Sequence, residues 1–167
     1  LAVAGSVAVT ASEFDHIFVS HTSDDHGPIE LHVASAGDPN DPLIVCIHGW
    51  PETWWSWRHQ MRHLAARGFR VAAMDVRGYG GSSKPDEIAA YRITELASDA
   101  AAVIGSLSPN SPAIVMGHDW GAPIAWHTAR LYPDLVRAVV GMSVPYTPAS
   151  QGNPMDLWDL LYPDRFF

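Results

Sequence analysis

The ten residues from 113 to 122 read Ala113-Ile114-Val115-Met116-Gly117-His118-Asp119-Trp120-Gly121-Ala122. An apolar run ends at Gly117, and a helix-like segment begins directly after Gly121. Because each glycine lies two residues from Asp119, the backbone can turn tightly from strand to helix where side chains would collide. The central side chain then projects above the sheet at a helix N-terminus, whose dipole favours an anion. We interpret the stretch as a nucleophile elbow in which Asp119 attacks without a base removing its proton.

Strand-like segments flank this turn on both sides. Residues 14–19 and 29–34 alternate apolar and polar side chains and predict an antiparallel hairpin that turns at residues 24–27. Nearly continuous apolar runs are typical of parallel strands covered on both faces, and they occupy residues 43–47, 69–74, 113–116 and 136–142.

Helical faces separate these strands. The first, residues 54–65, ends before Gly68; the second, residues 96–107, has Thr94 as its predicted N-cap; the third covers residues 122–131. This order predicts an α/β fold with a mostly parallel, doubly wound sheet and an antiparallel N-terminal hairpin.

A second motif, Ile47-His48-Gly49-Trp50-Pro51, follows the first apolar strand. In a sheet of this kind, such a loop lies beside the elbow and offers a backbone N–H. We therefore expect the N–H groups of Trp50 and Trp120 to form an oxyanion hole that points at developing negative charge.

Three motifs resemble those of α/β-hydrolases of the epoxide hydrolase family: His-Gly-Trp-Pro-Glu at 48–52, Asp-Val-Arg-Gly-Tyr-Gly-Gly-Ser at 75–82 and Gly-His-Asp-Trp-Gly at 117–121. The resemblance implies the N-terminal part of an α/β-hydrolase core over residues 14–147. A flexible tail over residues 1–13 is expected before it, and the start of a helical cap over residues 148–167 after it. Within the motifs, the residues expected to support the site geometry are His48, Gly49, Pro51, Gly117, His118 and Gly121.

The resemblance also implies a mechanism. Asp119 would form an alkyl ester with an oxirane carbon, cap tyrosines would protonate the opening oxygen, and a water activated by a His–acid pair would release a vicinal diol. A small apolar epoxide and water are the expected partners, without a cofactor or metal. In this family the base His and its acid follow the cap, so a missing C-terminal half is expected to supply them, together with the last two of eight strands.

Two other functions stay open. Haloalkane dehalogenases share an Asp nucleophile and a following Trp, which Trp120 matches, although that family usually has Asn where this chain has Trp50. Residues 143–146 also offer no carboxylate for one dehalogenase group. The function from a different class is an inactive fragment or a non-catalytic binding protein.

Composition excludes several classes. Ten basic against 18 acidic residues give a net charge of −8, which argues against nucleic acid or an anionic membrane surface as partner. No apolar run of 18 residues occurs, and the single Cys46 excludes an internal disulfide or a cysteine-based zinc cluster. We expect a cytoplasmic protein and leave homodimer formation open.

Other conspicuous residues receive structural interpretations. Trp54 and Trp57 are expected in the core, whereas Trp50 is expected to line a cavity. His59 and His63 are four residues apart, but they flank the core-facing Met61 on a helix and should point to solvent. The glycine-rich stretch at 78–84 lacks the spacing of a phosphate loop, and we expect Asp75 and Arg77 to order it.

Overall fold

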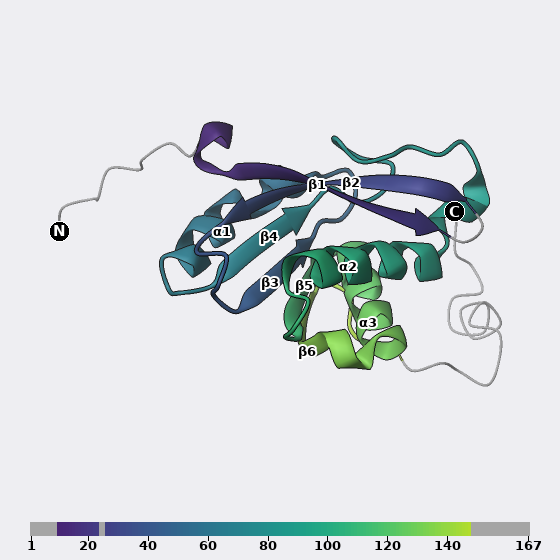
Figure 1. Cartoon of the computed structure of the whole chain (residues 1–167). Helices are drawn as coiled ribbons and strands as arrows, with labels where there is room; N and C mark the ends of the chain where they lie inside the picture. The colour runs from purple at the N-terminus through teal and green to yellow at the C-terminus, as the bar shows by residue number, and fades with distance from the viewer. Residues whose placement is uncertain (1–9, 24–25, 148–167) are drawn as a thin grey trace, which may run out of the picture.

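The computed structural model describes residues 10–23 and 26–147 and contains one six-stranded sheet (Figure 1). Its order is β1-β2-β4-β3-β5-β6. The strands are β1 (Asp15–Ser23), β2 (Gly27–Ala36), β3 (Leu43–Ile47), β4 (Arg70–Met74), β5 (Ala113–His118) and β6 (Val136–Met142). β2 pairs antiparallel with β1 and β4, and the remaining pairs are parallel. The predicted α/β fold with an antiparallel beginning is confirmed.

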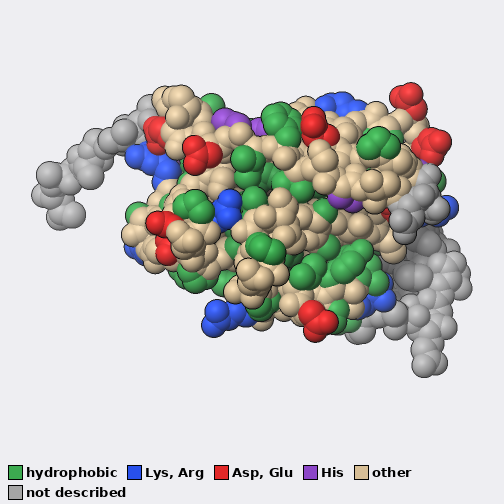
Figure 2. Space-filling view, in the orientation of Figure 1, with side chains coloured by type: hydrophobic (Ala, Val, Ile, Leu, Met, Phe, Trp, Pro, Cys, Tyr) green, Lys and Arg blue, Asp and Glu red, His purple; other side chains and the backbone are tan. Residues whose placement is uncertain are grey.

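Helices cover both faces of the sheet, because its central strands are apolar on both sides. α2 (Ile93–Leu107) and α3 (Gly121–Leu131) pack on the face that presents Val45, whereas α1 (Arg58–Ala65) packs on the face that presents Cys46. Figure 1 shows α2 and α3 together on one side, and Figure 2 shows hydrophobic side chains gathered over that region. The sheet is therefore doubly wound, as predicted.

Several boundaries differ from the prediction. Within the predicted tail of residues 1–13, Ala11–Glu13 form a 3-10 turn, η1, and the first nine residues lie outside the described structure. The predicted hairpin turn is described only at His26 and Gly27, and the predicted cap start at 148–167 also lies outside. The segment predicted as one helix from Trp54 begins as a 3-10 turn, η2 (Trp54–Trp57).

Thr94 is not the N-cap of α2. The helix begins at Ile93, so Thr94 lies inside its first turn. Arg92 is at the N-cap position, and its side chain makes no capping hydrogen bond. The reason is that the Arg92 carbonyl accepts the N–H groups of both Glu95 and Leu96, directly after the 3-10 turn η3 (Ile88–Tyr91). The backbone turn thus opens the helix without a side-chain cap.

β6 is less covered than its apolar sequence predicts. Within the described residues it pairs with β5 alone, and Val140 is 41% exposed. A strand at the edge of a sheet keeps one row of backbone groups unpaired and fewer neighbours on its faces. No helix in the described part of the chain is long and apolar enough to cross a membrane.

One buried ion pair joins the loop after β4 to α2. Arg77 is fully buried; its Nε and Nη2 donate to Asp99 at 2.9 and 2.6 Å, and its Nη1 donates to the Ala90 carbonyl at 2.8 Å. His21 of β1 also bonds to Asp99, at 2.6 Å. These contacts tie the hairpin, the loop and the helix together.

Replacing Asp99 by Asn should therefore lower the free energy of unfolding by about 3–5 kcal/mol, because Arg77 would keep a buried charge without its hydrogen-bonded counter-ion. The carboxylate of Glu95, 3.8 Å from Arg77 Nη1 and partly exposed, is too distant to replace it. Urea unfolding of the variant and the parent measures this difference. The matched control is Glu87→Gln, which removes an exposed carboxylate bonded to His26 and should cost under about 1 kcal/mol. Equal losses in the two variants would contradict the assignment.

Candidate active site

The predicted elbow is present at the end of β5. Asp119 has a left-handed backbone conformation, with φ of 52°, between β5 and the first residue of α3. A Cβ on Gly117 would meet the carbonyl of Gly121, and a Cβ on Gly121 would meet the carbonyl of Ile47 in β3. Both glycines are therefore required for the strand, the helix and β3 to approach so closely.

The loop after β3 reaches the elbow directly. The Trp50 N–H donates to Asp119 Oδ1 at 2.9 Å, and the Trp50–Pro51 peptide is cis. Because β3 and β5 are neighbours in the sheet, their carboxyl ends place this loop and the elbow side by side. The structure thus brings together Trp50 and Asp119, as the sequence predicts.

His48 anchors that loop from below. Its Nδ1–H donates to the Gly49 carbonyl at 2.8 Å, and its Nε2 accepts the Val76 N–H at 3.0 Å. Burial, opposed by the Gly49 hydrogen bond and nearby carboxylates, holds the pKa of His48 below its ordinary value. Both ring nitrogens of this neutral imidazole are occupied, so His48 supports the loop and has no nitrogen free for proton transfer.

Asp119 is held as a carboxylate. The backbone N–H of Trp50, followed by that of Trp120, lowers the pKa of Asp119, and His118 adds a smaller effect in the same direction. Slight desolvation acts against them. Two converging amides are the arrangement that stabilises negative charge on an oxygen.

Glu52 is part of the motif at 48–52, but its role in the site was not predicted from the sequence. Its Oε2 accepts the Gly49 N–H at 3.0 Å and lies 3.4 Å from His118 Nδ1. The carboxylate therefore bridges the loop after β3 and the elbow. A turn in which the Glu52 N–H bonds to the Gly49 carbonyl allows this reach, and the three-residue spacing was the available signal.

Two tryptophans are in the core as predicted, whereas Trp50, which was expected to line a cavity, is not among the residues that line the one beside the elbow. Trp54 and Trp57 are buried, whereas Trp50 and Trp120 are each 66% exposed. Trp120 and Gly49 line a cavity of about 300 Å³ that extends between the elbow and the start of α2. Its other walls are mostly apolar and aromatic, with His48, Val76, Arg77, Tyr79, Tyr91, Ile93, Leu96 and Ile124.

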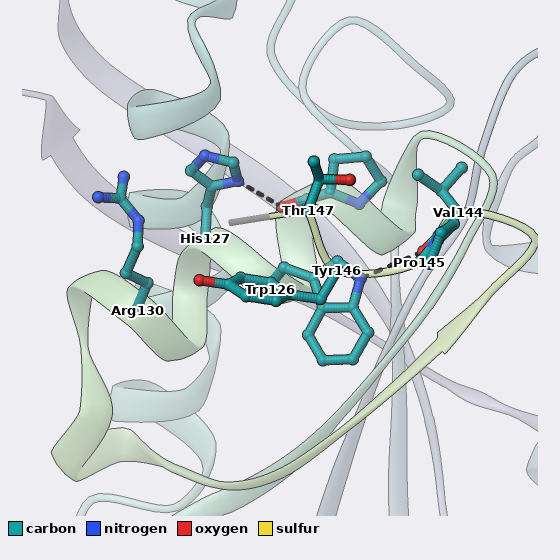
Figure 3. A pocket seen from close by; sticks show the side chains of 8 residues that line it. Trp126, His127, Arg130, Val144, Pro145, Tyr146 and Thr147 are labelled. Atoms are coloured by element: carbon teal, nitrogen blue, oxygen red, sulfur yellow. Dashed lines mark hydrogen bonds between the residues drawn. The ribbon is translucent and has the colours of Figure 1, made fainter. Parts of the chain in front are cut away.

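A second cavity, of about 280 Å³, lies between α3 and the segment after β6 (Figure 3). The Trp126 indole N–H donates to the Val144 carbonyl at 3.2 Å, and His127 Nδ1–H donates to the Pro123 carbonyl at 2.8 Å. Asp119 is not among the lining residues of either cavity, but the first includes its neighbours Trp120 and Gly49, and the second shares no lining residue with the first.

The remaining predicted residues have structural surroundings. His59 and His63 are exposed, and Met61 between them is fully buried. Asp75 orders the 78–84 loop as expected, since its Oδ2 accepts the Gly81 N–H at 2.9 Å. The expectation that Arg77 orders this loop was wrong. Its guanidinium donates to Asp99 in α2 and to the Ala90 carbonyl in η3, and it makes no hydrogen bond to the 78–84 loop.

Comparison with known proteins identifies related sequences. A family model of the α/β hydrolase fold matches residues 42–166. Epoxide hydrolase B from Mycobacterium tuberculosis is 53% identical over 112 residues, which are 67% of this chain and 31% of that protein. Epoxide hydrolase A from the same organism is 40% identical over 143 residues, which are 86% of this chain and 44% of that protein.

Solved structures agree with these relatives. Epoxide hydrolase A from Mycobacterium thermoresistibile has a TM-score of 0.80 at 42% identity, over 92% of this chain and 47% of that one. An epoxide hydrolase from Vigna radiata has a TM-score of 0.80 at 37% identity, over 93% of this chain and 46% of that one. The chain therefore spans less than half the length of each of these proteins.

The Asp119 carboxyl should titrate below the ordinary Asp pKa of about 3.9. Since the pKa is lowered in the folded state, its stabilising contribution is present at neutral pH and is lost as pH falls through the folded-state value. Carbon-13 NMR of the carboxyl group measures the midpoint. In Gly49→Ala the midpoint should rise, because the added Cβ would meet the Asp119 side chain and displace the Trp50 N–H.

The matched control is Gly105→Ala in α2, where a Cβ meets no atom within 4 Å. That variant should leave the Asp119 midpoint unchanged. If both glycine variants give the parent's midpoint, the Trp50 amide does not hold the carboxylate.

Proposed function

The chain belongs to the α/β hydrolase fold family, and we propose that its complete protein is an epoxide hydrolase that converts small apolar epoxides to vicinal diols. The observation that carries the proposal is the Asp119 carboxylate at the elbow, with Oδ1 accepting the Trp50 N–H at 2.9 Å. The similarity to proteins named epoxide hydrolases, up to 53% identity, supports the choice of substrate class.

The first step uses the carboxylate as it stands. Asp119 Oδ2 attacks an oxirane carbon, the bond from that carbon to the ring oxygen breaks, and an alkyl ester forms. The released oxygen takes a proton from an acid, for which the resemblance implies cap tyrosines. Asp119 is already ionised because the Trp50 and Trp120 amides lower its pKa, so this step needs no base.

The second step uses the same amides. A water attacks the ester carbonyl carbon, and Oδ1 becomes a tetrahedral oxyanion beside the Trp50 and Trp120 N–H groups. When the intermediate collapses, the acyl C–O bond breaks, the diol leaves and the carboxylate is restored. The Trp50 amide already binds Oδ1 in the free carboxylate, so it needs little reorganisation during this step.

The base for that water is proposed to come from the part of the protein that this chain does not span. Of the two histidines near Asp119, His48 has both ring nitrogens occupied. His118 faces the Glu52 carboxylate. A His–acid pair that follows the cap, as the resemblance implies, would activate the water.

A haloalkane dehalogenase is the second candidate. The observation that favours it is Trp120, which adjoins Asp119 and whose side chain is 66% exposed, so its indole N–H is available to an anion such as halide. Both candidates use the same nucleophile, and the leaving group separates them.

We expect Asp119→Ala to lower the rate of styrene oxide hydrolysis by the complete protein about 10⁴-fold or more, because the nucleophile is lost. Asp134→Ala, which alters an exposed aspartate in η4 (Pro133–Leu135), is the matched control and should keep the parent rate. A single turnover in H₂¹⁸O should give a diol without ¹⁸O, since its oxygens come from the epoxide and Asp119. Label in the first diol would instead indicate direct attack by water.

Halide release from a chloroalkane, measured alongside diol formation, decides between the two enzymes. Diol formation without halide release supports the epoxide hydrolase. Halide release without diol formation would establish the dehalogenase, and no turnover of either substrate by the complete protein would favour a non-catalytic binding protein.

A further inference from the structure

A chain of three titratable side chains lies outside the candidate active site. His32 Nδ1 is 2.8 Å from Asp75 Oδ2, and His32 Nε2 is 2.8 Å from His16 Nδ1. His16 Nε2 is in turn 3.3 Å from the Ala11 carbonyl oxygen in η1. The two imidazole rings are nearly parallel and meet through their edges, with centroids 5.1 Å apart and planes inclined by 15°. The chain thus runs from the end of β4, across β2 and β1, to the N-terminal turn.

Both ends of this chain can only accept hydrogen bonds. Ala11 contributes a carbonyl oxygen, and Asp75 contributes a carboxylate whose Oδ1 and Oδ2 also accept the N–H groups of Trp54 and Gly81. His32 Nδ1 and His16 Nε2 must therefore each carry a proton. The bond between the rings needs one more, on either His16 or His32. Three hydrogen bonds require three ring protons, and two neutral imidazoles hold only two.

The buried carboxylate supplies the reason for the third proton. Asp75 is 1% exposed and His32 is 8% exposed, and no lysine or arginine bonds to Asp75 among the described residues. A buried charge is stabilised by a counter-charge at hydrogen-bond distance. An imidazolium shared by His32 and His16 provides one, and exposed His16 gives the proton a path to solvent.

In the part of the chain that the structure describes, the other charged side chains near the pair are all exposed. Asp15 precedes His16, Glu30 lies two residues before His32, Glu13 of η1 pairs with Arg62 of α1 at 3.4 Å, and Lys84 bonds to carbonyls of the loop that packs on His32. Their effects are screened by water. Asp75 is therefore the charge that acts on the two rings.

We propose that His16 and His32 together carry three ring protons and one positive charge at pH 7, and that they form a proton-dependent clamp between η1 and the loop after β3. The clamp reaches that loop because the Trp54 N–H donates to Asp75 Oδ1 at 2.9 Å. The indole of Trp54 also packs edge-on against His16, with centroids 5.2 Å apart. This inference does not depend on the proposed function.

The sign of the pH dependence follows from the proton count. Above the ordinary histidine pKa of about 6.5, the same two side chains in the unfolded protein hold two protons, whereas the folded protein holds three. Folding therefore takes up a proton, and stability falls as pH rises. When the third proton leaves, the longest bond of the chain, from His16 to Ala11, should open first.

Nitrogen-15 NMR of the complete protein, labelled at histidine, counts the ring protons directly. At pH 7 we expect His16 and His32 to show three protonated nitrogens between them, and at high pH two. Two protonated nitrogens at pH 7 would overturn the proposal, and this measurement needs no variant other than those used for assignment.

A second measurement detects the same proton from the pH dependence of the folding equilibrium constant. The comparison variant is His16→Phe, which keeps an aromatic ring but removes the second imidazole. Between pH 7 and 8, the folding equilibrium constant should fall as pH rises, and the fall should be up to tenfold per pH unit larger in the parent than in His16→Phe. The control is His26→Phe, which removes a histidine whose one side-chain hydrogen bond within the described residues is to Glu87, and it should keep the parent's steepness. Equal slopes in the parent and His16→Phe would overturn the clamp.

Discussion

The hydrogen bond from the Trp50 N–H to Asp119 Oδ1 depends on nearly every other feature of the fold. Its partners are 69 residues apart in sequence and 2.9 Å apart in space. They meet because β3 and β5 are parallel neighbours, and because Gly117 and Gly121 let the elbow approach the end of β3. A side chain at either glycine would push the backbone away. The strand order and the two glycines together thus set the distance between the Trp50 N–H and Asp119 Oδ1.

The loop that carries this donor is held by contacts that leave it little freedom. The His48 ring bonds to the Gly49 carbonyl and to the Val76 N–H, and Glu52 accepts the Gly49 N–H. Further along, Asp75 accepts the Trp54 N–H. Preorganised amides stabilise charge effectively because they need not reorient during a reaction. These contacts therefore hold the Trp50 N–H beside the Asp119 carboxylate, where the proposed mechanism requires it.

Local patterns were sufficient to predict the fold and the elbow. The bounds predicted for β3 and β6 match the structure, because continuous apolar runs identify buried strands. The tight turn at Asp119 between β5 and α3 was identifiable from the two glycines, each two residues away from it. The Arg77–Asp99 pair and the His32–Asp75 contact were not, since 22 and 43 residues separate their partners and no periodic pattern links them. The prediction of Thr94 as the N-cap was wrong because the 3-10 turn before it determines where α2 begins. Residue preferences at helix ends do not describe such a turn.

The missed contacts share one physical cause. Asp75, Asp99 and Arg77 are ionisable groups with almost no exposure, and a buried charge must find its partner wherever the topology places one. The apolar pattern determines which elements pack, and only then do β1 and β2 bring His21 and His32 to these carboxylates. The antiparallel hairpin therefore does more than extend the sheet. It supplies the imidazoles that partner the carboxylates of Asp75, in the loop after β4, and Asp99, in α2.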